Sequence, residues 1–255
     1  MLSKLAVCLL ITASVARADA NSDQTTVTGL KEFTAAYQAW DAAGFKAASK
    51  LFDQACRQAP QSGTNFYWLG VADFHRLLHL LGTDQTHTHR PEAAKTIKRT
   101  IGALTQAVKL NERDAESHAL LGTVCGMSIA MSPPRALWLG PRVMKHQKLA
   151  LQYGPANPRV QYLLGMSHYH ASAFGGGKKE ALTCLLKAEK LYATEAEKAG
   201  GPLEPRWGRS SCLAFIGKTY DALGKPTEAE KYFRRALELN PQDRLAREDL
   251  KKRKP

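Results

Sequence analysis

The chain has 255 residues, 44% of them apolar, which is enough to bury the core of one or two domains or of one elongated repeat array. Its formal net charge of +13 favours acidic partners or anionic surfaces. Beyond the first residues no segment is apolar enough to cross a membrane, which argues against an integral membrane protein.

The first 18 residues have the pattern of a cleaved secretory signal. Lys4 precedes an apolar run over residues 5–16, and Ala16-Arg17-Ala18 fits the small-x-small pattern of a signal peptidase site. The run is about a dozen residues long, too short to span a bilayer as a helix. We expect cleavage after Ala18 and a periplasmic or secreted domain over residues 19–255 that rarely meets nucleic acid; an uncleaved anchor is the alternative.

Helical patterns then follow one another in pairs, with no period-two strand pattern between them. A mid-helix pair of an apolar residue and glycine recurs at Leu69-Gly70, Leu121-Gly122, Leu164-Gly165 and Ile216-Gly217. The predicted helix pairs run from about Thr28 to Pro60, Thr64 to Asn111, Asp114 to Pro155, Asn157 to Gly200 and Glu204 to Pro241. A short polar capping helix is expected to follow to about Lys252, since a solenoid needs a charged outer face at its end.

The fifth predicted pair carries the strongest internal signal. Its characteristic positions are Leu213, Gly217, Tyr220, Gly224, Ala229, Phe233, Ala236 and Pro241. The small residues let two helices cross closely, Phe233 fills the space between them, and Pro241 stops the second helix. These offsets resemble the tetratricopeptide repeat (TPR). The resemblance implies an all-α, right-handed solenoid of about five TPR-like helix pairs with a C-terminal capping helix.

The last hundred residues, with "NPRVQYLLG", "FGGGKKEAL" and "RWGRSSCLAFIGKTYDALGK", also resemble exported bacterial repeat proteins. This resemblance implies a bacterial origin and export. An exported, basic repeat protein also looks loosely like the soluble repeat component of some periplasmic transporters, by fold analogy alone.

The glycine run in "SAFGGGKKEALTCLL" raises the question of a phosphate loop. Such a loop needs a preceding strand and the spacing G-x-x-x-x-G-K-[ST], whereas here a helix precedes and Lys178 is followed by Lys179. We interpret Gly175-Gly176-Gly177 as a wide turn inside the fourth pair. An anion held by helix amides with the two lysines is the alternative.

The first helix of each pair is expected to line a concave groove. Its aromatic and basic side chains suit a peptide or an acidic protein segment, because aromatic rings give rigid contact area and cations fix carboxylates. The predicted partner-binding residues are Tyr67, Phe74, Arg159, Tyr162, Met166, Tyr169 and Lys218. A solvated groove, with the aromatics packed between repeats, is the alternative.

Four histidines lie close together in the sequence of the second pair. His75 and His79 share one helix face at i and i+4, and His87 and His89 follow in the loop. Imidazoles in this arrangement suit zinc, copper or nickel, although the sequence favours His75 as a groove-lining residue and His87 and His89 as loop residues in water. They give the alternative function, a solute- or metal-handling accessory protein.

The four cysteines outside the leader lie in helical patterns. Cys56, Cys125, Cys184 and Cys212 match no zinc spacing, and buried thiols compete with disulfides; Cys184 with Cys212 is the first pair to test.

The segment "MSPPRALWLGPRVMKHQ" departs from the repeat. We expect its Trp138 and Leu139 to tuck onto the solenoid, with a contact for a partner as the alternative.

No arrangement of residues supports catalysis, because the chain has no G-x-S-x-G and no protease cysteine signature. The sequence thus predicts a non-enzymatic scaffold without a cofactor, which binds a protein or peptide in its groove.

Overall fold

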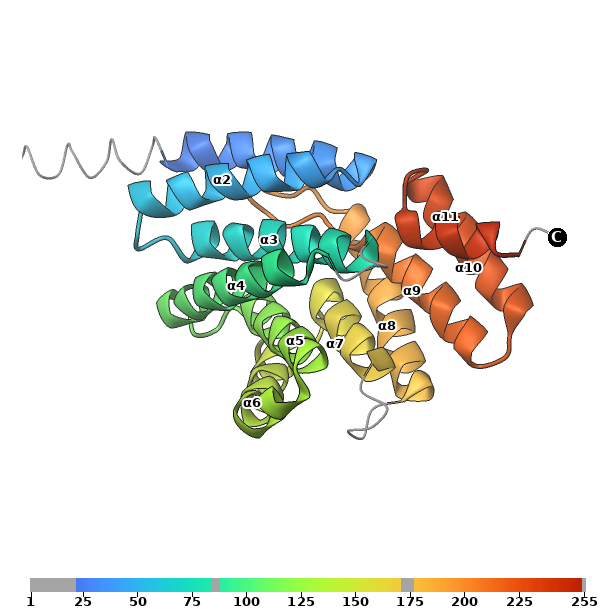
Figure 1. The fold of residues 1–255 in the computed structure, drawn as a ribbon. Coiled ribbons are helices and arrows are strands. Elements are labelled where there is room, and N and C mark those ends of the chain that lie inside the picture. Colours follow the sequence, from blue (N-terminus) through green and yellow to red (C-terminus); the bar gives the residue numbers. More distant parts are fainter. Residues whose placement is uncertain (1–21, 84–87, 171–176, 254–255) are drawn as a thin grey trace, which may run out of the picture.

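The computed structural model describes residues 22–83, 88–170 and 177–253, and within these ranges it contains helices and no strand (Figure 1). The first described helix covers residues 22–39. The elements that follow are α2 (Ala42–Gln58), α3 (Gly63–Thr83), α4 (Arg90–Leu110), α5 (Ala115–Met131), the 3-10 helix η1 (Pro133–Arg135), α6 (Ala136–Tyr153), α7 (Pro158–His170), α8 (Lys178–Ala196), α9 (Arg209–Ala222), α10 (Pro226–Leu239) and α11 (Arg244–Lys251).

Successive helices pack as antiparallel pairs, which confirms the predicted all-α array. The pairs are residues 22–39 with α2, α3 with α4, α5 with α6, α7 with α8, and α9 with α10. The last helix, α11, caps the array as predicted: the Asp243 carboxylate accepts the Ala246 amide at 3.2 Å, and the buried Ala246 anchors the helix.

Glycines stand where paired helices cross most closely. A Cβ on Gly217 would lie 2.7 Å from the Phe233 ring, and one on Gly165 would lie 2.6 Å from Leu185. Only a hydrogen fits there, because interiors are close-packed. This is the physical reason for the glycine in the fourth and fifth pairs.

Two predicted boundaries differ from the structure. α8 ends at Ala196 and α9 begins at Arg209, so residues 197–208 form an irregular segment rather than the ends of two helices. We call this segment the strap. Gly200, Gly201, Pro202 and Pro205 keep this segment from forming a helix, because glycine and proline are the two weakest helix formers.

The two ends of the array touch each other. The Tyr37 hydroxyl lies 2.9 Å from the Ser211 hydroxyl, and the Asn240 side chain donates to the Tyr37 carbonyl at 3.4 Å. The Arg244 guanidinium donates to the Gly82 carbonyl at 3.1 Å. Figure 1 shows the same closure, with α9 and α11 beside the ends of the N-terminal helices. The array therefore curls until its last pair meets its first.

The structure also bears on the glycine run, the cysteines and the question of a membrane-spanning helix. Gly175 and Gly176 fall outside the described residues, so the wide turn stays a prediction, and Gly177 caps α8. All four described cysteines are free thiols, so the suggested Cys184–Cys212 disulfide is not formed. No helix in the described part of the chain is both long and apolar enough to span a bilayer.

Candidate partner-binding site on the inner face

The first helices of the pairs turn one side toward the inside of the curl, and the strap lies across that side. We call this surface the inner face. In Figure 1 the orange strap leaves α8 and runs toward the N-terminal helices before α9 begins. The Trp68 indole donates to the Leu203 carbonyl of the strap at 3.2 Å. The concave surface is therefore occupied by an irregular piece of the chain itself.

Trp207 is the anchor of the strap. Its side chain is only 3% exposed, its indole N–H donates to the Tyr67 hydroxyl at 3.0 Å, and its ring meets the edge of His75 at 5.1 Å between centroids. The next residue, Gly208, has φ +102, where a Cβ would lie 2.3 Å from the Tyr192 hydroxyl. Only glycine can make this turn into α9.

A buried network of charges holds the strap to three helices. Arg159 of α7 donates through Nε to Glu116 of α5 at 2.8 Å and through Nη1 to Glu195 of α8 at 3.0 Å. Its Nη1 also reaches the Trp207 carbonyl at 3.5 Å. The Tyr67 hydroxyl donates to the second oxygen of Glu116. Each partner satisfies another, as buried charges require.

The network also fixes the charges of its members. Burial alone would lower the pKa of Arg159, but Glu116 and Glu195 raise it well above its ordinary value. Burial, and then the charge of Glu116, raise the pKa of Tyr67, which stays a neutral donor. The arrangement suits permanent recognition of a carboxylate or carbonyl rather than proton transfer.

His75 stands at the centre of an aromatic cluster next to the strap. It is 3% exposed, and its Nδ1–H donates to the Val71 carbonyl at 2.8 Å. Burial lowers the pKa of His75 to about 4, so the ring is neutral near pH 7. Its ring neighbours are Phe33, Tyr37, Trp40, Phe45, Phe74 and Trp207.

The structure gathers the predicted groove residues on the inner face but buries most of them. Those that are less than 5% exposed are Tyr67, Phe74, Arg159, Tyr162 and Met166. Tyr169 and Lys218 remain half-buried at the end of the face. The expected open groove is therefore filled, and binding of a partner by these residues stays a prediction.

The four candidate metal ligands do not form one described cluster. His75 is enclosed by aromatic rings, and His87 lies outside the described residues. His79 lies over Trp40 with 6.4 Å between ring centroids, and His89 precedes α4. No group of three or more His, Cys, Asp or Glu side chains among the described residues is arranged to hold a metal ion. Metal binding by the four stays a prediction.

A cationic corner lies where the inner face remains accessible. The Lys178 ammonium sits 3.4 Å from the centre of the Tyr169 ring and donates to the Tyr169 carbonyl. Burial, and then the charge of Lys218, lower the pKa of Lys178. Among the described residues neither lysine forms an ion pair, whereas the nearby Asp249 is paired with Lys252 at 3.0 Å. This corner suits a carboxylate from outside.

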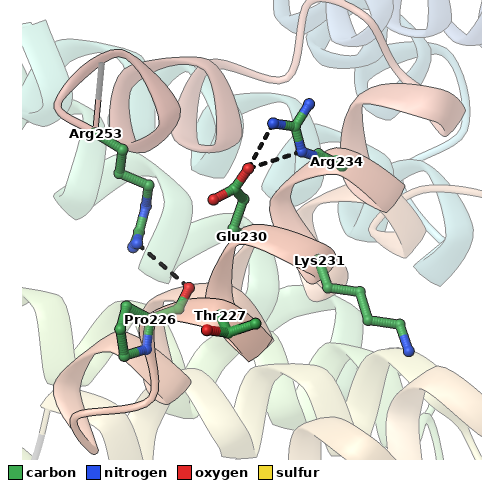
Figure 2. A pocket seen from close by; sticks show the side chains of 6 residues that line it. All are labelled: Pro226, Thr227, Glu230, Lys231, Arg234 and Arg253. Carbon is green, nitrogen blue, oxygen red and sulfur yellow. Dashed lines mark hydrogen bonds and ion pairs between the residues drawn. The ribbon is translucent and has the colours of Figure 1, made fainter. Parts of the chain in front are cut away.

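Two surface hollows accompany these features. A cleft of about 680 Å³ lies at the edge of the strap and reaches Tyr67, Glu116 and Pro205. A second hollow, on the outer side of α10, is shown in Figure 2. Its side chains are engaged within the protein: Arg234 and Glu230 form an exposed pair with Nε–Oε1 at 2.9 Å, and Arg253 donates to the Pro226 carbonyl at 3.4 Å. We therefore place the candidate site at the strap.

Sequence reasoning missed the strap and its anchor. The signal was present in "GGPLEPRWG", where glycines and prolines interrupt the helical pattern before Ser210. It missed the role of Tyr37 altogether, because no local pattern shows that the two ends of the array meet.

The structure resembles solved helical-repeat proteins. It aligns with the HusA haemophore from Porphyromonas gingivalis with a TM-score of 0.61 and 19% identity, covering 76% of this chain and 92% of that one. It aligns with a thermophilic TPR protein from Thermus thermophilus with a TM-score of 0.58 and 17% identity, covering 86% and 95%. At these identities the likeness establishes the TPR-like fold.

Sequence comparison finds curated relatives and a matching family model. The chain is 28% identical over 138 residues to regulator of microtubule dynamics protein 3 from Rattus norvegicus, covering 52% of this chain and 29% of the relative. The protein of the same name from Bos taurus is also 28% identical over 138 residues. The chain spans less than a third of the length of these relatives. The model of the family "Regulator of microtubule dynamics protein 1-3" matches residues 75–253, so the chain belongs to that family.

Proposed function

We propose that the chain is a non-enzymatic, protein-binding scaffold whose inner face receives an extended segment of a partner protein in place of its own strap. The observation that carries this proposal is the strap itself. An irregular peptide with a buried tryptophan already lies on the inner face, held by Tyr67, Trp68 and Arg159. A surface that binds one non-helical segment of the chain has the shape and the donors to bind another.

The chemistry of the site indicates what the partner segment contains. An aromatic side chain would take the place of Trp207, and an acidic residue would reach the cationic corner of Lys178 and Lys218. The names of the curated relatives concern microtubule dynamics, which supports a protein rather than a small solute as partner. The basic composition supports the same choice.

The strap peptide is a probe for this exchange. Trp207→Ala in the full chain should loosen the strap, and a synthetic peptide of residues 197–208 should then bind in trans, measured by fluorescence anisotropy of a labelled peptide. The unaltered chain should bind the peptide at least about tenfold more weakly, because its own strap competes. A peptide with alanine in place of its tryptophan is the control. A Trp207→Ala chain that keeps its helical circular dichroism and ignores the peptide would contradict the proposal.

The cationic corner provides a second test with surface residues. Tyr169→Ala with Lys218→Glu should abolish capture of an acidic partner without unfolding the chain, because both side chains are half-exposed. Arg234→Glu on the outer hollow of Figure 2 is the matched charge control and should change nothing. Equal loss of the partner in both variants would argue for non-specific charge attraction.

We also propose that residues 1–18 direct export and are removed, as in exported bacterial repeat proteins. The support is the sequence pattern of a basic residue, a short apolar run and a small-x-small end. Mass spectrometry of the protein recovered from its native compartment tests the cleavage. A mature N-terminus other than Asp19 would contradict it.

A further inference from the structure

The outer side of α6 carries large apolar side chains that nothing covers. Leu137 is 84% exposed, Met144 72%, Trp138 62% and Leu151 43%. With the exception of Leu239, every exposed large hydrophobic side chain in the described residues belongs to α6. Such a concentration on one helix marks an interaction surface.

These residues form one stripe rather than a scatter. Leu137, Met144 and Leu151 follow each other at intervals of seven, which places them on one side of a helix. The opposite side of α6 packs on the rest of the protein through Leu139, His146 and Ala150. The expectation that Trp138 tucks onto the solenoid is therefore wrong, although Leu139 does so.

The stripe is exposed because of the way the third pair joins the fourth. α5 packs directly against α7, whereas α6 barely touches α7. Figure 1 shows α6 at the lower edge of the molecule, beyond α5 and far from α2 and α11. Exposure is highest at the start of the helix, near Leu137, so this end projects as a tip and not as a hollow.

The charge around the tip has one sign. No aspartate or glutamate occurs between Glu116 and Glu180, so η1 and α6 contain Arg135, Arg142 and lysines without any acidic residue. The two arginines are engaged within the protein: Arg135 donates to Ser128 at 2.9 Å and Arg142 to Thr105 at 2.6 Å. Lys145 and Lys148 are exposed beside the stripe and are available to an outside anion.

We propose that this face of α6 docks on the surface of a membrane that contains anionic lipids. A projecting tip of leucine, tryptophan and methionine enters the headgroup region, while the lysines beside it meet lipid phosphates and carboxylates. This is the pattern of a helix that lies on a membrane: apolar side chains with tryptophan on one side, and lysines at the boundary. A protein partner would instead need an acidic hollow that fits a convex ridge.

Vesicle binding by the full chain tests the proposal. Vesicles of phosphatidylcholine with phosphatidylserine should retain the protein in a flotation assay, and vesicles of phosphatidylcholine alone should retain much less. Leu137→Ser with Met144→Ser, and separately Lys145→Glu with Lys148→Glu, should each weaken binding to the mixed vesicles at least about tenfold. Leu239→Ser, which removes the exposed leucine of α10, is the matched control and should bind as the unaltered chain does.

Tryptophan quenching locates the contact independently of the apolar leader. Trp68 and Trp207 are buried, Trp40 is half-buried against the rings of Phe45 and His79, and the leader contains no tryptophan. Lipids with brominated chains should therefore quench mainly Trp138, which is 62% exposed. Trp138→Phe should remove that quenching while the protein still binds. The proposal is overturned if the chain ignores mixed vesicles, or if it binds them without quenching and without an effect of the α6 variants. Binding through the leader, or an acidic protein as the occupant, would then explain the observations.

Discussion

The fifth and third helix pairs each have a glycine in the middle of the first helix, Gly217 and Gly122, but the side chain that faces this glycine differs. In the fifth pair the Phe233 ring lies over Gly217, within 2.7 Å of where a Cβ would stand. Gln147 occupies the corresponding place in the third pair, three residues before Ala150 as Phe233 is three before Ala236. Around Gly122 the nearest side-chain atom is the Gln147 Cγ, at 3.5 Å.

A second contact within the third pair, between α5 and α6, is also polar. His118 and His146 face each other, with 2.8 Å between their Nδ1 atoms, in a pair whose counterpart in the fifth contains Leu213. His118 donates its Nε2–H to the Glu112 carbonyl, so its Nδ1 accepts the proton of His146. The difference teaches that a regular repeat can replace apolar contacts within one pair by polar ones and leave the outer side of its second helix free to meet something else.

Truncation of the side chain that faces the glycine should give the largest difference in stability between the fifth and third pairs. Phe233→Ala empties a fully buried site and should lower the free energy of unfolding by about 3–5 kcal/mol. Gln147→Ala, at the matching half-buried place, should cost less than about 1 kcal/mol. Urea denaturation measures both. Equal losses would mean that the third pair is packed as tightly as the fifth.

The junction between the third and fourth pairs depends on charge rather than on a ring. Arg159→Met leaves the carboxylates of Glu116 and Glu195 buried without a cation, and we expect a loss of about 3–5 kcal/mol. The exposed pair Arg234–Glu230 provides the control, since Arg234→Met should cost less than about 0.5 kcal/mol. If Arg159→Met proved neutral, the network would not be what fixes α5 against α7.

Alanine in place of each glycine tests the crossing itself. Gly217→Ala pushes a methyl group against Phe233 and the Ala229 carbonyl, which would lie 3.0 Å from it, and should destabilise the protein by about 1–3 kcal/mol. Gly122→Ala meets only ordinary contacts and should be neutral or stabilise by up to about 1 kcal/mol, because alanine favours a helix. Thermal unfolding of the two variants compares them directly, and a reversed order would refute the contrast.

The last expected effect is a pH dependence that belongs to the third pair. Burial, and then the charge of His118, lower the pKa of His146 to about 4. The ordinary value is higher, so this contribution to stability is complete above about pH 6.5 and is lost as the pH falls toward 4. His146→Leu should remove about 2 kcal/mol of the destabilisation seen at about pH 5. Unfolding curves of both proteins, recorded at about pH 5 and above about pH 6.5, measure this change in the free energy of unfolding. An unchanged pH dependence in His146→Leu would assign the effect elsewhere, for example to His75, whose pKa is also lowered to about 4.

The sequence predicted the helix pairs and their partners because the signal is local. Gly217, Ala229 and Phe233 recur at helical spacing, and each glycine reports a crossing only one helix away. The predicted site residues were gathered on one face for the same reason. That Tyr67 and Arg159 are covered could not be predicted, because the cover comes from an irregular segment 140 residues beyond Tyr67.

The exposure of Trp138 on α6 could not be predicted from the sequence, for a different reason. Whether Trp138 is covered depends on how α7 is placed against α5, where Arg159 of α7 pairs with Glu116 of α5, and both residues are distant in sequence from the tryptophan. Gln147, which stands where the consensus repeat has a phenylalanine, is a local sign that the third pair departs from the repeat.

The contact of Tyr37 with Ser211, across 174 residues of chain, has a consequence for how the molecule comes apart. An open row of repeats frays from its termini inward, one unit at a time. Here each terminus is clasped by the other, so no unit is free to peel away first. Loss of either end should release the other, and melting should be a single concerted step rather than a zipper.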